Sequence, residues 1–211
     1  MSLRKQIRER GYSSLRSFED KYIGWLNHVK VFIKPTNREE IEALTELQNI
    51  PGVPNMMDHF PIIHSIYTFV VVTQYIKGKT LEQITNKNTL RLSEKMSITD
   101  ALLEIVDNIH REGWVHGDIN LQNVIIDSNL EVFLLDYATT FKPEEEYPKK
   151  GFLYPPPESL MLKRNKYIID PHYRVNKEYD LWTLGLVLFV LGLARFRDNI
   201  KKCYQKATFC S

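Results

Sequence analysis

The chain has 211 residues, of which 43% are hydrophobic and 26% charged, which is typical of a globular protein with one sizeable core or two small lobes around a cleft. Its formal net charge of +2 excludes a strongly basic protein, so we expect neither nucleic acid nor a membrane among its partners. The two cysteines, Cys203 and Cys210, exclude a disulfide scaffold, and no apolar segment follows the basic N-terminus as in a secretory signal, so we expect a cytoplasmic protein.

The first third of the chain predicts a strand, a helix and a second strand. Residues 28–34, HVKVFIK, alternate in the manner of a half-buried strand and are rich in β-branched residues. Residues 36–50 have an acidic first turn and apolar residues at helical spacing, and Pro51 stops the helix. Residues 67–76, YTFVVVTQYI, predict a strand that ends before a turn at Gly78.

The remainder of the chain is predicted to be mostly helical. Residues 96–113 place their apolar side chains on one helix face, and two short apolar segments, NVIID and EVFLLD, predict a small hairpin. The run LWTLGLVLFVLGLA at 181–194 is short for a membrane crossing and predicts a buried core helix. We therefore expect a strand-rich lobe at residues 1–76, a helical lobe at residues 77–211, and a ligand in the cleft between them.

The stretch WVHGDINLQNVIID, residues 114–127, places a histidine, a glycine, an aspartate and an asparagine between two apolar runs. A polar turn between strands would also contain Gly and Asn, so the pattern needs support from elsewhere. Three further segments follow in order: LLDYA with Asp136, YPPPES with Glu158, and DLWTLG with Asp180. Together the four segments resemble the catalytic loop, the magnesium-binding Asp-Phe-Gly, the Ala-Pro-Glu and the central buried helix of protein kinases.

The resemblance implies an α+β, bilobal protein-kinase-like fold with a small β-rich N-lobe and a shortened helical C-lobe. It also implies an enzyme that uses ATP and Mg²⁺ to phosphorylate a protein hydroxyl. Asp118 would be the catalytic base, and Asn123 and Asp136 would hold the metal. Asn120 stands where Ser/Thr kinases usually have lysine, and could hydrogen-bond a phosphate oxygen without neutralising it. We expect a structural role for His116, which would hold the catalytic loop.

In the N-lobe, VKVFIK resembles the Val-Ala-Ile-Lys strand of the family, so Lys34 would bind the α- and β-phosphates. Its ion-pair partner is expected in the next helix. Glu40 is the first choice because the residues three, four and seven positions later are apolar, and Glu39 and Glu42 stay open. VVTQYIKGKTL resembles the hinge, which would supply a gatekeeper side chain and two backbone contacts to adenine: Thr73, Gln74 and Ile76.

The glycine-rich loop is the weakest part of the resemblance. GYSSLRSF, residues 11–18, stands where this loop is expected, and glycines matter there because backbone amides must approach the phosphates closely. Gly11 is present, whereas Ser13 and Arg16 occupy the other glycine positions. Ser13 could donate its hydroxyl to a phosphate, and Arg16 could reach the phosphates or seal the cleft.

Other departures from the family leave the function open. Gly117 replaces an arginine that usually meets a phosphorylated activation segment, which suggests activity without such phosphorylation. The spelling His-Gly-Asp is also that of small-molecule phosphotransferases. The segment from Asp136 to Glu158 is short, and the chain ends soon after Asp180. We expect a Ser/Thr protein kinase, with two alternatives: a pseudokinase that acts as a binding module, and a small-molecule phosphotransferase.

Compact kinases of this type also resemble the effector kinases that bacteria inject into host cells, and a viral or phage origin fits the same features. On this resemblance the chain would be a monomer that is delivered into a host cell without a cleavable signal peptide and takes part in virulence. Its substrate would be a host protein, and the effector resemblance suggests a heat-shock chaperone.

Overall fold

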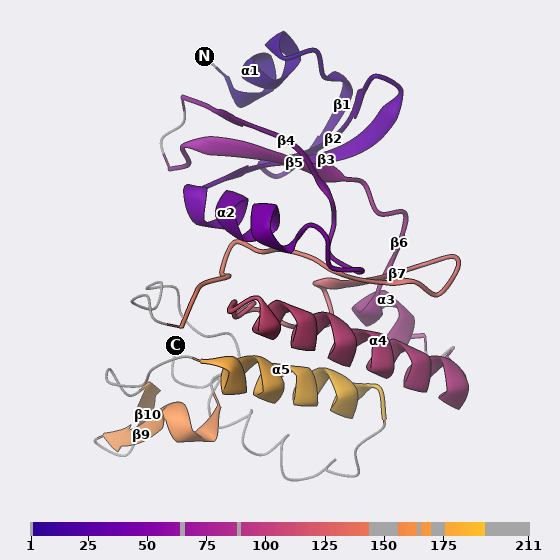
Figure 1. Ribbon diagram of the computed structural model, residues 1–211, viewed down its shortest axis with the longest axis vertical. Helices are drawn as coiled ribbons and strands as arrows, with labels where there is room; N and C mark the ends of the chain where they lie inside the picture. Colours follow the sequence, from indigo (N-terminus) through magenta and orange to yellow (C-terminus); the bar gives the residue numbers. More distant parts are fainter. Residues whose placement is uncertain are drawn as a thin grey trace.

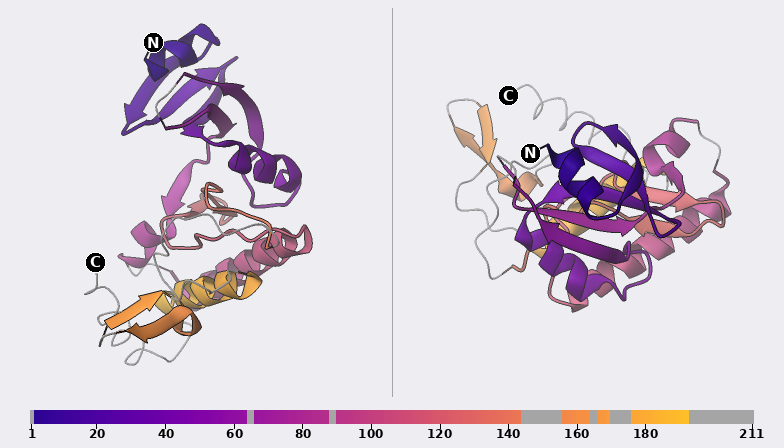
Figure 2. Two further views of the ribbon diagram at one scale, coloured as in Figure 1. Left: turned by 90° about the vertical axis from the view of Figure 1, so that its left-hand side faces the viewer. Right: turned by 90° about the horizontal axis from the view of Figure 1, so that it is seen from above.

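The computed structural model describes residues 2–63, 66–87, 90–143, 156–163, 166–169 and 176–192. Within these residues, an antiparallel sheet with two helices forms one lobe, and a mostly helical lobe lies below it in Figure 1. The left view of Figure 2 shows that a short strand, β6, lies in the passage between the lobes. The described part of the chain is therefore α+β and bilobal, as predicted.

The upper lobe contains a five-stranded sheet with the strand order β1-β2-β3-β5-β4. Helix α1, Leu3–Glu9, covers one face, and helix α2, Arg38–Leu47, lies on the opposite face, toward the lower lobe (Figure 1). Every neighbouring pair of strands is antiparallel. The strands are β1 Ser13–Phe18, β2 Lys21–Leu26, β3 Val29–Thr36, β4 Met56–Pro61 and β5 Phe69–Gln74.

Alternate residues of β5 serve two different cores, which explains its unbroken run of valines. Val70 and Val72 pack in a cluster with Ile7 of α1, whereas Val71 packs with Leu44 of α2. Both predicted strands and the predicted helix of this lobe are thus present, as β3, β5 and α2. Helix α1, the β1–β2 hairpin and β4 were not predicted, because each element has only six or seven residues and too little periodicity to indicate it.

The described part of the lower lobe contains two long helices, a three-stranded sheet of order β6-β7-β8 and several short elements. Helices α4 and α5 lie side by side, and the sheet lies above them, toward the upper lobe (Figure 1). The predicted hairpin is present as β7 and β8. The elements are β6 Gly78–Thr80, α3 Leu81–Thr85, α4 Leu92–Arg111, β7 Val124–Asp127, β8 Val132–Leu134, the 3₁₀ turn Pro157–Ser159, β9 Leu160–Lys163, β10 Lys166–Ile169 and α5 Lys177–Val190.

The larger hydrophobic core belongs to both lobes. Leu44 and Leu47 of α2 pack in the same cluster as Ile105 of α4. Gly52, after α2, accepts a hydrogen bond from the backbone N–H of Leu134 at 2.9 Å. A Cβ at Gly52 would lie 2.3 Å from Cδ1 of Ile105, and its φ of +89° favours glycine, so no other residue fits this approach. Helix α2 is therefore anchored to the lower lobe, although the sheet precedes and follows it in sequence.

The apolar run predicted as a buried core helix forms α5. Leu184 and Val187 are buried in the larger core, whereas Leu181 and Val190 are exposed among the described residues. None of the described helices combines the length and the apolar character needed to cross a bilayer. The predicted lobe boundary at residue 76 falls in the segment between β5 and β6.

Candidate active site

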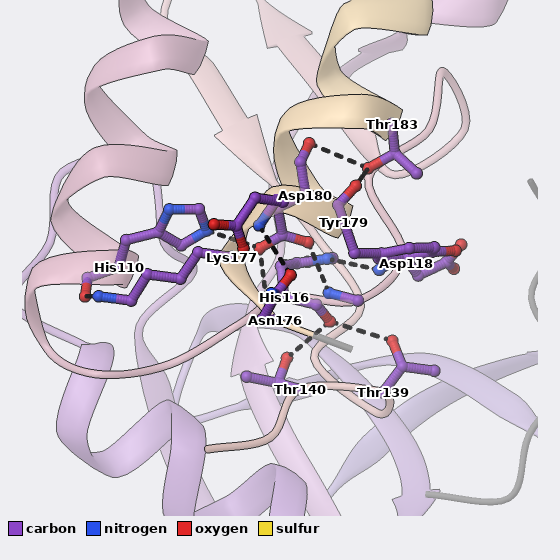
Figure 3. Close-up of polar contacts among 12 residues, drawn as sticks. His110, His116, Asp118, Thr139, Thr140, Asn176, Lys177, Tyr179, Asp180 and Thr183 are labelled. Atoms are coloured by element: carbon purple, nitrogen blue, oxygen red, sulfur yellow. Dashed lines mark hydrogen bonds and ion pairs between the residues drawn. The ribbon is translucent and has the colours of Figure 1, made fainter. Parts of the chain in front are cut away.

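The loop between α4 and β7 is held in place by one buried carboxylate. Asp180, in the first turn of α5, has no exposed surface and accepts hydrogen bonds from the backbone N–H groups of His116 at 2.7 Å and Gly117 at 2.9 Å. The Nε2 atom of His110 on α4 lies 2.9 Å from the same carboxylate. Figure 3 shows these contacts converging from α4, α5 and the loop. A buried carboxylate needs several donors, so Asp180 fixes the backbone of this loop.

His116 joins this loop to the segment that follows β8. Its Nδ1 accepts a hydrogen bond from the backbone N–H of Asp118 at 3.2 Å, and its Nε2 lies 3.1 Å from the carbonyl oxygen of Leu135. One ring nitrogen accepts and the other donates, which is the pattern of a neutral imidazole. Burial lowers the pKa of His116, although the charge of Asp180 opposes this effect. These contacts support the structural role expected for His116.

The carboxylate of Asp118 is oriented by two asparagines of its own loop. Nδ2 of Asn120 donates to one oxygen at 2.9 Å, and Nδ2 of Asn123 donates to the other at 2.8 Å. Burial raises the pKa of Asp118, and the hydrogen bonds from these amides oppose that shift. A fixed carboxylate with an increased proton affinity is suited to accept a proton.

Lys34 lies at the centre of an ion triad. Its Nζ lies 2.7 Å from Oε1 of Glu40 on α2 and 2.6 Å from Oδ1 of Asp136, which follows β8. Burial alone would lower the pKa of Lys34, but the two carboxylates outweigh burial and raise it, so the side chain is charged. The triad joins β3 and α2, which follow each other in the chain, to the segment after β8, where Asp136 lies 102 residues after Lys34.

Glu40 is the acidic residue of α2 that faces the triad. Its side chain is buried, whereas Glu39 and Glu42 are exposed on the helix. Thr36 donates its hydroxyl to the second carboxylate oxygen of Glu40. The predicted ion pair between Lys34 and Glu40 is therefore present, for the reason given from the sequence: the apolar residues that follow Glu40 at helical spacing are buried.

Asp136 has an uncommon backbone conformation, with φ at +64°. Residues other than glycine pay a steric cost for this left-handed conformation, and strained residues of this kind cluster at active sites. Burial would raise the pKa of Asp136, but the charge and hydrogen bond of Lys34 outweigh burial and lower it to about 2. Asp136 is therefore ionised at neutral pH.

Tyr137, next in the chain, is buried against His116, with the ring centroids 4.9 Å apart in an edge-on arrangement. Its hydroxyl is buried and has no hydrogen-bond partner among the described residues. An unpaired buried hydroxyl costs about 1–3 kcal/mol. The ring therefore stabilises the core, whereas the hydroxyl opposes it.

The oxygens that remain free beside Asp118 fit a divalent cation. Nδ2 of Asn123 donates to Asp118, and Oδ1 of Asn123 has no hydrogen-bond partner in the described part of the chain. Lys34 contacts Oδ1 of Asp136, so Oδ2 of Asp136 is available. Amide and carboxylate oxygens are the ligands that Mg²⁺ prefers. The described residues contain no cluster of three or more His, Cys, Asp or Glu with metal-site geometry, so phosphate oxygens and water would have to complete the shell.

A cavity of about 490 Å³ lies between the lobes and is large enough for a nucleotide. The ion triad closes one end, and the segment between β5 and β6 borders the other. The backbone N–H of Ile76 has no partner among the described residues, whereas that of Gln74 donates to the carbonyl of Asn55 at 2.9 Å. The predicted site residues that line the cavity are Lys34, Glu40, Thr73, Gln74, Ile76, Asn123 and Asp136.

A comparison with known families identifies this arrangement. A model of the protein kinase domain matches residues 26–208. The chain belongs to the protein kinase family.

Three curated relatives show how distant the similarity is. The chain is 28% identical over 165 residues to the phosphorylase b kinase gamma catalytic chain, liver/testis isoform, of Rattus norvegicus, which is 75% of this chain and 39% of the relative. It is 29% identical over 170 residues to serine/threonine-protein kinase 1 of African swine fever virus, covering 75% and 50%. It is also 29% identical over 174 residues to the "probable serine/threonine-protein kinase KIN1 homolog" of Enterocytozoon bieneusi, covering 80% and 28%. The chain thus spans half or less of the length of these relatives.

The structure does not bring Gly11 and Ser13 into the kinase cavity. Gly11 lies in the turn between α1 and β1, and Ser13 begins β1 at the end of the hairpin remote from its turn. The turn that overhangs the cavity is formed by residues 18–21, and its Phe18 and Lys21 line the cavity. The expected phosphate loop at 11–18 is therefore corrected to this turn. The prediction followed the glycine, whereas the turn of this kinase contains none.

Gly117 has a local structural explanation. Its φ is +79°, and a Cβ there would lie 2.8 Å from the carbonyl oxygen of Thr139. Any side chain, including the arginine usual in protein kinases, would require the loop to shift. His-Gly-Asp in this chain thus follows from a close backbone contact, which weakens its value as a sign of small-molecule substrates.

Replacement of Lys34 by methionine should lower the free energy of unfolding by about 3 kcal/mol at pH 7, because two carboxylates lose their partner. The pKa of Asp136, about 2, lies below its ordinary value near 4, so this stabilisation is present above pH 4 and is lost as the pH falls toward 2. Urea unfolding of both proteins at several pH values should show their difference shrinking in that range. A difference that stays constant would contradict the triad.

Replacement of Tyr137 by phenylalanine should stabilise the kinase by about 1 kcal/mol, because it removes an unpaired buried hydroxyl. The melting temperature should rise by roughly 2–4 °C. Tyr12→Phe is the matched control, since the hydroxyl of Tyr12 donates to Asp58 at 2.7 Å and its loss should destabilise. If both variants lower the melting temperature, the hydroxyl of Tyr137 is not unpaired.

Proposed function

We propose that this chain is an ATP- and Mg²⁺-dependent protein kinase that transfers the γ-phosphate of ATP to a serine or threonine hydroxyl of a protein. The observation that carries the proposal is the contact of Lys34 with both Glu40 and Asp136, at the end of a nucleotide-sized cavity. Membership in the protein kinase family supports phosphoryl transfer. The names of two relatives, both serine/threonine-protein kinases, support the acceptor.

The environment of each side chain supports a separate task. Phosphoryl transfer depends mainly on positioning and on stabilisation of negative charge. Lys34 supplies a compact positive charge, and Asp118 orients the acceptor hydroxyl and takes its proton. Mg²⁺, held by Asn123 and Asp136, would neutralise charge on the phosphates. Asn120 donates to Asp118, so it holds the base in place and carries no charge to the phosphate.

Transfer of radiolabelled phosphate from ATP to protein should be lost in two variants for different reasons. Asp118→Asn keeps the shape of the side chain but removes the proton acceptor, so turnover should fall by roughly 10²–10⁴-fold while ATP still binds. Asp136→Ala removes a metal ligand and should weaken Mg²⁺-dependent ATP binding as well. Asp100→Asn, an exposed substitution on α4, is the control. Equal labelling by wild type and Asp118→Asn would refute the assignment.

A kinase-shaped binding module is the second candidate, and the glycine-free turn at residues 18–21 favours it. Thermal unfolding separates the two: a nucleotide-binding kinase should gain about 2.7 kcal/mol of stability with ATP and Mg²⁺ at 100 times the dissociation constant. Wild-type protein whose melting temperature does not change with millimolar ATP and Mg²⁺ would support the binding module.

The substrate and the place of action are also proposals. A monomeric kinase that acts in the cytoplasm, or in a host cell after delivery as an effector, would phosphorylate other proteins, and a host heat-shock chaperone is the first to test. Incubation with ATP, Mg²⁺ and a eukaryotic lysate, followed by mass spectrometry, would identify new phosphosites. Phosphorylated chaperone that is absent with Asp118→Asn would support the chaperone, and its absence would remove it.

A further inference from the structure

We propose that Lys21 is a second phosphate-binding cation of the nucleotide site, which acts beside Lys34 and replaces contacts that a glycine-rich turn would make. The inference rests on the proposed function, because it assigns a residue to the binding of ATP by the same cavity. It assigns a binding role to a residue outside the four motifs that indicate the family.

The position of Lys21 places its side chain over the cavity. It is the first residue of β2, pairs with Phe18 across the turn, and is half-buried. It lines the nucleotide cavity together with Lys34 and Asp136, and it lines a neighbouring groove of about 640 Å³ together with the same two residues. Lys21 therefore borders the end of the cavity at which Lys34 and Asp136 lie.

The charges at this end require a further cation. Lys34 is already shared between Glu40 and Asp136, so the triad has a net charge of about −1 before any phosphate arrives. Lys21 has no carboxylate within ion-pair distance among the described residues, and its charge is therefore available to a ligand. A triphosphate would otherwise meet a site whose lysine is fully engaged.

The turn at residues 18–21 is not suited to hold the phosphates through its backbone amides, as a glycine-rich loop would. In protein kinases a glycine-rich loop covers the phosphates with its backbone. Here residues 18–21 all have side chains, and Glu19 adopts a left-handed φ of +54°, which normally favours glycine. A lysine has a flexible four-carbon stem with three donors, so it can reach a phosphate that the backbone cannot approach.

The turn also contains two acidic residues, Glu19 and Asp20, whose charges oppose phosphate binding. Glu19 and Asp20 line the neighbouring groove but not the nucleotide cavity, whereas Lys21 lines both. Of these three residues, Lys21 is thus the one that borders the nucleotide cavity.

The test compares ATP and adenosine, which differ in the phosphates alone. Purified wild type (residues 1–211), Lys21→Met, Lys21→Arg and Lys5→Met are titrated with ATP plus Mg²⁺ and with adenosine by calorimetry. Lys5 lies exposed on α1, so Lys5→Met controls for the loss of one positive charge. We expect Lys21→Met to raise the dissociation constant for ATP about tenfold, Lys21→Arg to restore it, and adenosine to bind all four proteins alike.

The salt dependence of ATP affinity is a second measurement, and a purely structural role of Lys21 would leave it unchanged. The affinity of wild type for ATP should decrease with added salt more steeply than that of Lys21→Met, because one charge contact is already missing in the variant. If Lys21→Met binds ATP as tightly as the wild type does, the inference is overturned and the proposed function stays intact. An equal loss of adenosine binding would also overturn it. Absence of ATP binding in wild type would overturn the proposed function together with the inference.

Discussion

The contact of Lys34 with Glu40 and Asp136 is the interaction on which the geometry of the site depends. Among the described residues it is the ion contact that ties β3 and α2 to the segment after β8 at the cavity. The desolvation of a buried ion pair largely offsets its attraction, so the triad contributes more to relative placement than to stability. It works here because α2 is already anchored: Leu44 and Leu47 pack in the lower core, and Thr36 holds the second oxygen of Glu40.

A second buried carboxylate, that of Asp180, fixes the position of the catalytic loop. Asp180 binds the backbone of His116 and Gly117, and the ring of His116 binds the carbonyl of Leu135, directly before Asp136. The loop that contains Asp118 and the segment that leads to Asp136 are therefore both positioned from the same helix, α5. Figure 3 shows the contacts of Asp180 with this loop. His116 is fully buried, and burial lowers the pKa of its imidazole, which favours the neutral form in this connection near neutral pH.

The sequence was sufficient to predict the parts of the fold that have strong periodicity or long motifs. Strands β3 and β5, helix α2 and the β7–β8 hairpin follow from apolar spacing, and the pairing of Glu40 with Lys34 follows from the helical spacing of the apolar residues behind it. The phosphate loop was predicted at residues 11–18 and lies instead at the β1–β2 turn, because this turn has Glu19 in a left-handed conformation that usually indicates a glycine. The role of Lys21 depends on that register, so no motif could have indicated it. The hydroxyl of Tyr137 could not be assigned either, because only packing determines whether it has a partner.

The charges of the free site indicate how it should meet a nucleotide. Asp136 is ionised, Asp118 has an increased proton affinity, and the triad is negative overall. A triphosphate without a cation would add negative charge to such a site, and Coulomb repulsion is strong where the surroundings are partly buried. Free oxygens on Asn123 and Asp136 can accept a divalent cation, which reverses the sign of the local field. Binding of metal and nucleotide should therefore be strongly coupled in this chain, more so than in a kinase whose phosphates are held by the amides of a glycine-rich loop.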